Sequence, residues 1–203
     1  MIVILNYGMG NLRSVQKALE KVGFQALITH DPDDILAARG VVLPGVGAFA
    51  NAMANLKQVN LIGVLQQVVA MRKPLLGICL GLQLLLSSSE EDGWHPGLDF
   101  IPGTVKRLPK RVKVPHMGWN QINIQRENPL LQGIPKQTFY YFVHSYYVQP
   151  DDPNCIDAFT TYDVTFPSVI SNDRVFGMQF HPEKSHDLGL RILKNFGELV
   201  KKC

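Results

Sequence analysis

Short apolar segments alternate with helical stretches through the first half of the chain. Four of these segments are predicted strands in which apolar and polar residues do not alternate: Ile2–Leu5, Gln25–Thr29, Gly40–Pro44 and Pro74–Ile78. Strands of this kind are buried on both faces, which is typical of a parallel sheet with helices on each side. The sequence therefore predicts an α/β fold with a mostly parallel open sheet flanked by helices.

Helical periodicity lies between and after these strands, and Asn11 is the predicted N-cap of the first helix. Further helices are expected at Ala48–Leu56, Leu61–Met71, Leu80–Leu86 and Asp187–Lys201.

The second half of the chain consists mainly of short β-rich pieces separated by Gly and Pro. These pieces are Trp119–Ile124, Thr138–Val143, Ala158–Tyr162 and Val175–Phe180. They predict additional antiparallel strands, which either extend the main sheet or form a second, smaller one. The 203 residues contain no repeat and no linker, so residues 1–203 are expected to form a single domain.

Composition argues against several classes of function. The net charge of +3 is too small to indicate nucleic-acid binding, and the basic segment Lys106–Lys113 is interpreted as an exposed hairpin. Three cysteines without a CxxC pair argue against a disulfide framework and a zinc site and favour a reducing compartment, the cytoplasm. No apolar run reaches the roughly 18 residues that a membrane span requires.

No cofactor and no metal are expected. Gly8-x-Gly10 follows the first strand, but Arg13 stands where a dinucleotide loop needs its third glycine. His116 and His144 lack ligand spacing to any cysteine or acid, so they are interpreted as hydrogen-bonded structural histidines.

Cys79 lies between two glycines directly after a predicted strand, in Gly77-Ile78-Cys79-Leu80-Gly81. A nucleophile on a tight strand-to-helix turn needs small residues two positions away on each side, because the turn brings their backbones together. The turn places the sulfur at a helix N-terminus, where the dipole favours the thiolate. The N–H of Leu80 is a candidate oxyanion donor. The structural alternative is an inert buried cysteine.

A candidate base for this nucleophile lies in Phe180-His181-Pro182-Glu183. In an extended segment, His181 and Glu183 project to the same face, so the carboxylate could orient the imidazole. Taken alone, a His-Pro-Glu tripeptide is usually a turn. Both stretches, however, follow predicted strands at the edge where α/β sheets bind their ligands.

A second glycine-flanked loop, Pro44-Gly45-Val46-Gly47, follows the third predicted strand. Glycine tolerates positive φ, so a peptide plane at Val46 could rotate and supply a second oxyanion donor. A simple turn that starts the next helix explains the same residues.

These three blocks, in this order and spacing, resemble the class I (triad) glutamine amidotransferases, whose fold is flavodoxin-like. Within the family, three further segments resemble the glutaminase subunits of imidazole glycerol phosphate synthases: Asn6–Asn11, Met117–Asn120 and Tyr141–Tyr147. The resemblance implies hydrolysis of L-glutamine to glutamate and ammonia through a cysteinyl thioester. It implies Cys79, His181 and Glu183 as the catalytic residues. It implies glutamine binding by Gly47, Gln83, Ser145 and Tyr146.

The resemblance also implies a heterodimer with a cyclase subunit, a (β/α)8 barrel that receives the ammonia and makes imidazole glycerol phosphate and an aminoimidazole carboxamide ribotide for histidine biosynthesis. The residues expected at this interface are Asn11, Trp119, Tyr141 and Lys184. Trp119 is equally readable as a core residue, and Lys184 as a solvated surface lysine.

Two other functions fit parts of the sequence. A glutaminase of another ammonia-channelling synthase, or a related cysteine amidohydrolase or peptidase, would share the turn at Cys79; Gln83 and the Pro-Gly-Val-Gly loop favour glutamine. A regulatory module that has lost activity would lack a triad member, and here all three are present.

Overall fold

The computed structural model describes residues 1–202; Cys203, one of the three cysteines, lies outside the described residues. The strands are β1 (Ile2–Leu5), β2 (Ala26–Thr29), β3 (Gly40–Gly45), β4 (Leu75–Cys79), β5 (Leu86–Ser89), β6 (His95–Pro96), β7 (Ile101–Arg107), β8 (His116–Ile124), β9 (Gln137–His144), β10 (Tyr146–Pro150), β11 (Ile156–Tyr162), β12 (Val164–Asn172) and β13 (Val175–Met178). The α-helices are α1 (Leu12–Lys21), α2 (Pro32–Ala37), α3 (Phe49–Gln58), α4 (Leu61–Ala70), α5 (Leu80–Leu84) and α6 (His186–Lys201). Single 3-10 turns are η1 (Pro129–Leu131), η2 (Pro153–Cys155) and η3 (Pro182–Lys184).

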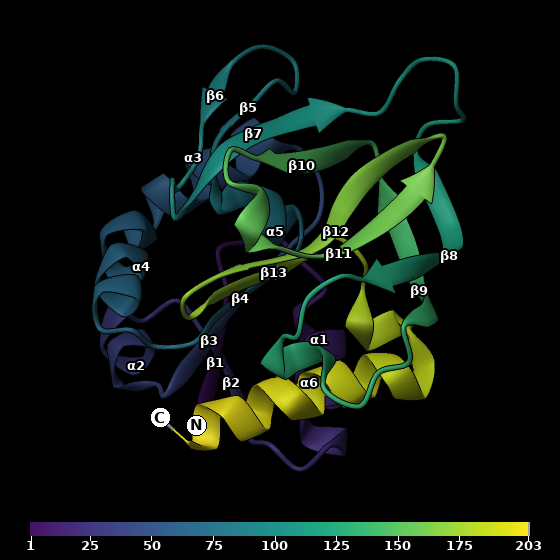
Figure 1. Cartoon of the computed structure of the whole chain (residues 1–203). Coiled ribbons are helices and arrows are strands. Elements are labelled where there is room, and N and C mark those ends of the chain that lie inside the picture. Colours follow the sequence, from purple (N-terminus) through teal and green to yellow (C-terminus); the bar gives the residue numbers. More distant parts are fainter. Residues whose placement is uncertain (203) are drawn as a thin grey trace.

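The main sheet has a parallel half, which confirms the predicted fold class (Figure 1). Strands β2, β1, β3, β4 and β13 lie side by side in parallel. Along β1, Ile2 and Ile4 belong to the core under α1 and α6, whereas Val3 and Leu5 belong to the core under α2, α3 and α4. Because side chains alternate across a strand, burial on both faces requires a continuous apolar run.

The β-rich second half realises both alternatives that the sequence left open. Strands β12, β11, β8 and β9 extend the main sheet in antiparallel fashion beyond β13. Strands β10, β7, β5 and β6 form a separate four-stranded sheet among the described residues. Within residues 1–202, no helix has the length and apolar content needed to cross a membrane.

Several element predictions were wrong. The helix expected at Leu80–Leu86 ends at Leu84, because Leu86 already pairs with Ile101 of the second sheet as part of β5. Helix α2 was missed although Asp31 caps it and Pro32 starts it. Strands β7, β10 and β12 were also missed.

The basic segment is not a hairpin. Its first two residues, Lys106 and Arg107, end β7, whose antiparallel partner is the distant β10 rather than a neighbouring strand. The remaining residues form the loop to β8, where Arg111 contacts Asp163 at 2.5 Å on the exposed surface.

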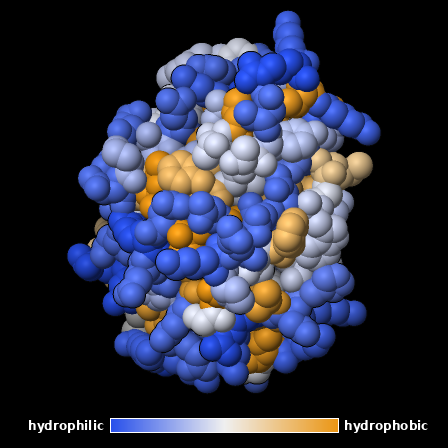
Figure 2. Space-filling model, turned by 45° about the vertical axis from the view of Figure 1, so that its right-hand side comes forward, coloured by the Kyte–Doolittle hydropathy of each residue, from blue (hydrophilic) through white to orange (hydrophobic). Residues whose placement is uncertain are grey.

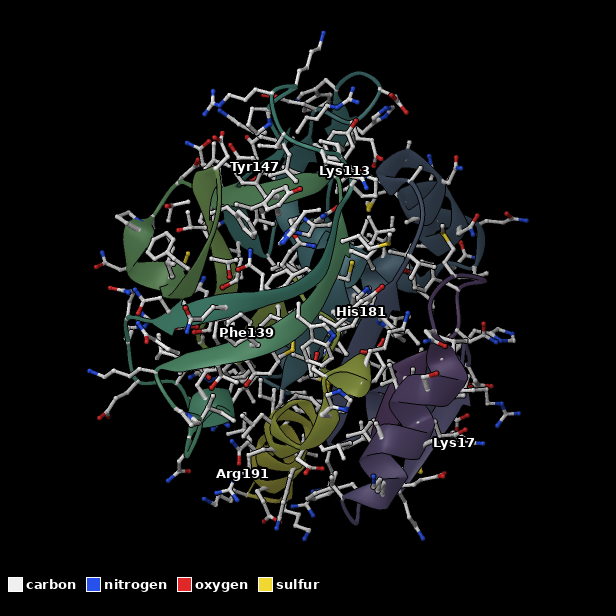
Figure 3. The ribbon with its side chains drawn as sticks, turned by 90° about the vertical axis from the view of Figure 1, so that its right-hand side faces the viewer. Lys17, Lys113, Phe139, Tyr147, His181 and Arg191 are labelled. Carbon is white, nitrogen blue, oxygen red and sulfur yellow. The ribbon has the colours of Figure 1, made fainter. Side chains whose placement is uncertain are left out.

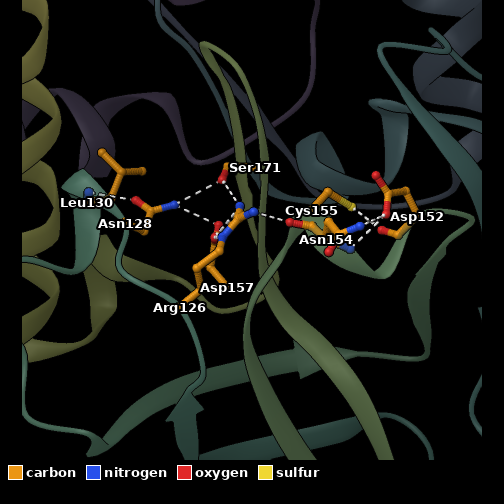
Figure 4. Close-up of polar contacts among 8 residues, drawn as sticks. All are labelled: Arg126, Asn128, Leu130, Asp152, Asn154, Cys155, Asp157 and Ser171. Atoms are coloured by element: carbon orange, nitrogen blue, oxygen red, sulfur yellow. Dashed lines mark hydrogen bonds and ion pairs between the residues drawn. The ribbon is translucent and has the colours of Figure 1, made fainter.

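A polar cluster fastens η1 to the antiparallel extension (Figure 4). The fully buried Asp157 accepts from Arg126 Nε at 2.8 Å and from Asn128 Nδ2 at 2.7 Å. Asn128 also donates to Ser171 and caps η1 by accepting from Leu130 N at 2.7 Å. Burial raises the pKa of Asp157, and these donors offset part of that effect. The carboxylate is thus paired as a buried charge must be.

Candidate active site

The three sequence blocks meet because their strands are neighbours in the parallel sheet. Strand β4 lies between β3 and β13, with Gly45 opposite Cys79 in register on one side and Met178 opposite Ile78 on the other. All three strands run in the same direction, so the loops that follow them emerge at one edge. Figure 3 shows His181 where the turn before α6 meets the β8–β9 ribbon.

Cys79 occupies a strained backbone conformation, with φ of 56° and ψ of −109°. A β-carbon at Gly77 would lie 2.7 Å from the carbonyl oxygen of Gly81, so the turn does bring these two backbones together. A β-carbon at Gly81 would lie only 1.8 Å from the Leu43 carbonyl oxygen of β3. Gly77 is therefore needed for the tight turn, and Gly81 is needed for the turn to pack against β3. Helix α5 begins directly after Cys79.

His181 and Glu183 are paired, but not by the predicted extended geometry. Residues 182–184 form the 3-10 turn η3, because Pro182 favours a first helical position and the Ser185 N–H donates back to its carbonyl. Within this turn His181 Nδ1 still lies 2.8 Å from Glu183 Oε1. Both side chains are at most 2% exposed. The buried Nε2 of His181 makes no hydrogen bond, which leaves it free to face a reactant.

The electrostatic surroundings of His181 favour its charged form. Burial alone would lower the pKa of His181, but the adjacent Cys79 sulfur and the Glu183 carboxylate together raise the pKa to about 10. The imidazole is thus protonated near neutral pH and lies beside the Cys79 sulfur. Burial and the Cys79 charge likewise raise the pKa of the Tyr7 hydroxyl, which stays neutral.

A cavity of about 360 Å³ opens directly over Cys79. It contains every residue predicted for the oxyanion hole and for glutamine binding, together with four residues that were not predicted as site residues. Its lining is Val46, Gly47, Cys79, Leu80, Gln83, Glu91, Pro115, Val143, His144, Ser145, Tyr146 and His181. The volume lies in the range of small-molecule sites.

Gln83 and Gln179 form a buried hydrogen-bonded pair next to the sulfur. Gln83 Nε2 donates to the Tyr146 carbonyl at 2.9 Å and to Gln179 Oε1 at 3.2 Å. Gln179 Nε2 in turn donates to Cys79 Sγ at 3.8 Å. Gln179 was missed as a site residue, although it lies two positions before His181.

The Pro44–Gly47 loop is anchored at its start and exposed at its tip. The buried Tyr7 hydroxyl donates to the Pro44 carbonyl at 2.7 Å. Gly47 has φ of +95°, and a β-carbon there would lie 2.8 Å from the Met9 methyl group. Val46 is 42% exposed at the cavity mouth. The loop therefore has one fixed end and a side chain that packing does not hold.

The two histidines set aside as structural are indeed hydrogen-bonded and buried. Asn120 Nδ2 lies 3.2 Å from His116 Nε2, and His116 Nδ1 lies 2.9 Å from His144 Nε2. His144 Nδ1 donates to the Tyr146 carbonyl at 2.9 Å. Burial lowers the pKa of His116 to about 4 and that of His144 to about 3, so both rings are neutral. The chain of bonds ends on the same carbonyl that Gln83 contacts.

Three of the four residues predicted for the partner interface lie together. Trp119 on β8 is opposite Tyr141 on β9, with ring centroids 6.2 Å apart, and is 46% exposed. Lys184 Nζ lies 5.9 Å from the centre of the Tyr141 ring. Asn11 occupies the N-cap position of α1, but its side chain makes no capping bond to the backbone; its Oδ1 accepts from the Ser14 hydroxyl at 2.9 Å. Helix α1 packs beside η3. Trp119 is thus not a core residue.

The same ribbon carries further exposed apolar side chains. Met117 on β8 is 64% exposed and Phe139 on β9 is 55% exposed. Phe139 is labelled on this ribbon in Figure 3, and Figure 2 shows apolar residues in separate patches among hydrophilic ones. Neither residue was singled out from the sequence, although both lie within or beside the motifs of the resemblance.

Glu91 is the most important site residue that sequence reasoning missed. It follows β5 in a loop and reaches the cavity, where its Oε2 accepts from the Phe49 N–H at the start of α3 at 2.7 Å. Burial raises the pKa of Glu91, partly offset by that bond. No local motif signals it, because its position depends on the second sheet.

Comparison with known proteins agrees with this geometry. A family model described as glutamine amidotransferase class-I matches residues 3–199. The imidazole glycerol phosphate synthase subunit HisH of Moorella thermoacetica is 56% identical over 200 residues, 98% of this chain and 95% of the relative. The subunit HisH of Archaeoglobus fulgidus is 51% identical over 203 residues, 100% of both chains. The structure of PurLQS from Thermotoga maritima superposes with a TM-score of 0.77 at 17% identity, over 99% of this chain and 97% of that one, a likeness of fold alone. Because the family model spans nearly the whole sequence, the chain belongs to the class I glutamine amidotransferase family.

Proposed function

We propose that this chain is the glutaminase subunit of an imidazole glycerol phosphate synthase and hydrolyses L-glutamine to glutamate and ammonia for histidine biosynthesis. The observation that carries the proposal is that Cys79 lines the same cavity as a buried, Glu183-bound His181, whose pKa the sulfur helps to raise. A thiolate beside an imidazolium is the arrangement that covalent acyl transfer by cysteine needs.

The chemistry follows from the three side chains. The Cys79 sulfur attacks the side-chain amide carbon, and the developing oxyanion is stabilised by backbone N–H groups at Leu80 and Val46. His181 gives its Nε2 proton to the nitrogen as the C–N bond breaks, so ammonia leaves and a glutamyl thioester remains. His181 then takes a proton from water, which attacks the thioester and releases glutamate. Glu183 holds the imidazole orientation throughout.

The residues that line the cavity match the polar groups of free glutamine. Glu91 provides a carboxylate for the α-ammonium group, and Gly47, Gln83 and the segment Ser145–Tyr146 surround the remainder of the substrate. A negative side chain at this depth favours an amino acid with a free ammonium group over an internal peptide residue. This favours a glutaminase over a peptidase.

Replacement of Glu91 by Gln is expected to raise the KM for glutamine about tenfold or more, because a charge-assisted hydrogen bond contributes roughly 1.5–3 kcal/mol. The amide oxygen of Gln can still accept from the Phe49 N–H, so α3 keeps its contact and kcat at saturation should change little. Steady-state glutaminase kinetics measure both constants. Glu90→Gln, at an exposed neighbouring position outside the cavity lining, is the matched control and should leave KM unchanged.

The proposal includes a heterodimer with a cyclase subunit, a (β/α)8 barrel that accepts the ammonia, in the reducing environment of the cytoplasm. The surface around Trp119, Tyr141 and Lys184 lies next to η3 and supports this assignment, since a partner docked there would be close to the origin of the ammonia.

The deciding experiment is a glutaminase assay of the isolated chain, repeated with the cyclase subunit and with its ribulosyl phosphate ligand. Very low turnover alone, with strong stimulation by partner and ligand, is expected, since the exposed Val46 loop completes the oxyanion hole only on demand. High turnover by the chain alone would contradict partner gating. Stimulation by the partner of a different synthase, and not by the cyclase, would assign the chain to that synthase.

A further inference from the structure

The backbone of His181 is clasped to strand β9 by one buried hydroxyl. Ser185 Oγ donates to the His181 carbonyl at 2.6 Å and accepts from the Tyr141 N–H at 3.0 Å. The His181 N–H donates to the Tyr141 carbonyl at 2.9 Å. The N–H and the C=O of Tyr141, on the free edge of β9, therefore both form hydrogen bonds with the turn that contains His181. Ser185 is 2% exposed, so water does not compete for these bonds.

The clasp is supported from the other side by helix α6. The Gly189 N–H donates to the Ser185 carbonyl at 3.0 Å, and a β-carbon at Gly189 would lie 2.1 Å from the Pro182 carbonyl oxygen. The first turn of α6 is thus packed directly on η3. The packing of α6 holds Ser185 in place, so that its hydroxyl can accept from the Tyr141 N–H and donate to the His181 carbonyl at the same time.

The strand held by this clasp also bears the exposed aromatic surface. The Tyr141 side chain faces Trp119 and lies under Lys184, while its main chain contacts His181 and Ser185. Because a single hydrogen bond joins Tyr141 to the His181 N–H, a shift of β9 at Tyr141 should also move the backbone of His181. Trp119 adds a second link, because its ring stacks on His186 at the start of α6, with centroids 4.8 Å apart.

We propose that Ser185 is a positioning residue for glutamine hydrolysis: its hydroxyl fixes the distance between His181 and Cys79 and makes that distance depend on strand β9. The proposal rests on the function proposed above, since it assumes that His181 serves Cys79. Ser185 does not line the cavity. Replacing it should therefore slow the chemical step rather than weaken glutamine binding.

The test is Ser185→Ala in the complex with the cyclase subunit and its ribulosyl phosphate ligand. The variant leaves the His181 carbonyl and the Tyr141 N–H without their shared partner, so the turn can relax away from the sulfur. We expect kcat to fall about tenfold or more, because small misplacements of a catalytic group are costly, with KM within about twofold of the parent. Partner affinity, measured by titration calorimetry, should change little.

A second readout does not depend on glutamine turnover. The rate at which iodoacetamide alkylates Cys79 at pH 7, followed by peptide mapping, reports how well the imidazolium stabilises the thiolate. This rate should fall several-fold in Ser185→Ala. If the alkylation rate falls in Ser185→Ala but the parent complex does not hydrolyse glutamine, Ser185 still positions His181 beside Cys79 and the proposed function fails.

Thr138→Val is the matched control. Thr138 is a buried β9 residue whose hydroxyl donates to the Pro135 carbonyl at 2.8 Å, away from the histidine turn. Its loss weakens the same strand without touching His181, so kcat and the alkylation rate should stay near those of the parent. An equal fall of kcat and of the alkylation rate in both variants would mean that the loss comes from destabilising β9 in general, which would contradict the proposal. Parent-like kcat and alkylation in Ser185→Ala would overturn the proposal.

Discussion

Glutamine hydrolysis is expected to be lost, by a factor of about 10⁴ or more, when Cys79 is replaced by Ser. The hydroxyl fits the same turn, but an alcohol is not ionised by the neighbouring imidazole as a thiol is, so no competent nucleophile forms. Glutamate release by the complex with the cyclase subunit and its ligand measures the loss. Thermal melting and partner titration should give parent-like values, because the substitution changes one atom in a side chain that is 6% exposed.

Cys155→Ser provides the matched control. Cys155 is also buried, but its thiol donates to the Asp152 carbonyl at 2.9 Å, and burial with the nearby acids raises its pKa to about 11. It does not line the cavity over Cys79 and should be dispensable for turnover. Retained hydrolysis by Cys79→Ser, or equal loss in both variants, would end the assignment of Cys79 as the nucleophile.

Gly81→Ala is expected to destabilise the fold by about 4 kcal/mol or more, or to prevent folding. The new β-carbon would lie 1.8 Å from the Leu43 carbonyl oxygen and 2.8 Å from its carbon. That carbonyl belongs to β3, which is paired on both sides in the parallel half of the sheet, so neither backbone can move away cheaply. Overpacking against a backbone costs more than against a flexible side chain. Denaturant unfolding measures the change.

Gly63→Ala tests whether the cost arises from this contact or from replacing a glycine. Gly63 lies exposed within α4, and a β-carbon there would meet no atom within 4 Å. Alanine in a helix interior should stabilise by up to about 1 kcal/mol, the opposite sign. A folded Gly81→Ala protein of parent stability would show that the turn at Cys79 is not packed against β3 in this way.

The parallel half of the fold was predictable because its signals are local. The predicted strands at Ile2–Leu5 and Gly40–Pro44 agree with β1 and β3 to within one residue. The helix after Asn11 and the long C-terminal helix were also placed correctly, to within one residue at their starts. Each follows from apolar spacing or from a capping residue, which the chain carries in a few consecutive positions.

The misses have different causes. Strand β12 was missed although its partners β11 and β13 are its neighbours in the sequence. Strand β7 pairs with the distant β10 and with β5, so its register depends on residues outside its own segment. The end of the helix after Cys79 was misplaced for the same reason, since β5 takes over at Leu86. The segment after His181 was predicted to be extended, but Pro182 fits the first position of a 3-10 turn equally well, and the packing of α6 on this turn favours that conformation.

The sequence by itself determined the chemistry: a cysteine on a glycine-flanked turn, a histidine with an acid two positions later, and strands that bring both to one edge of a sheet. Only the tertiary structure decided the walls and the control of the site. It placed Glu91, which follows β5 of the second sheet, at the cavity. It linked His116 and His144 to the Tyr146 carbonyl by hydrogen bonds. It also joined His181 to β9 through the Ser185 hydroxyl. Side-chain type and spacing specify which groups can react, because they act within a few residues. Which groups surround them depends on the register of strands separated by tens of residues, and that register is set by the packing of the whole core.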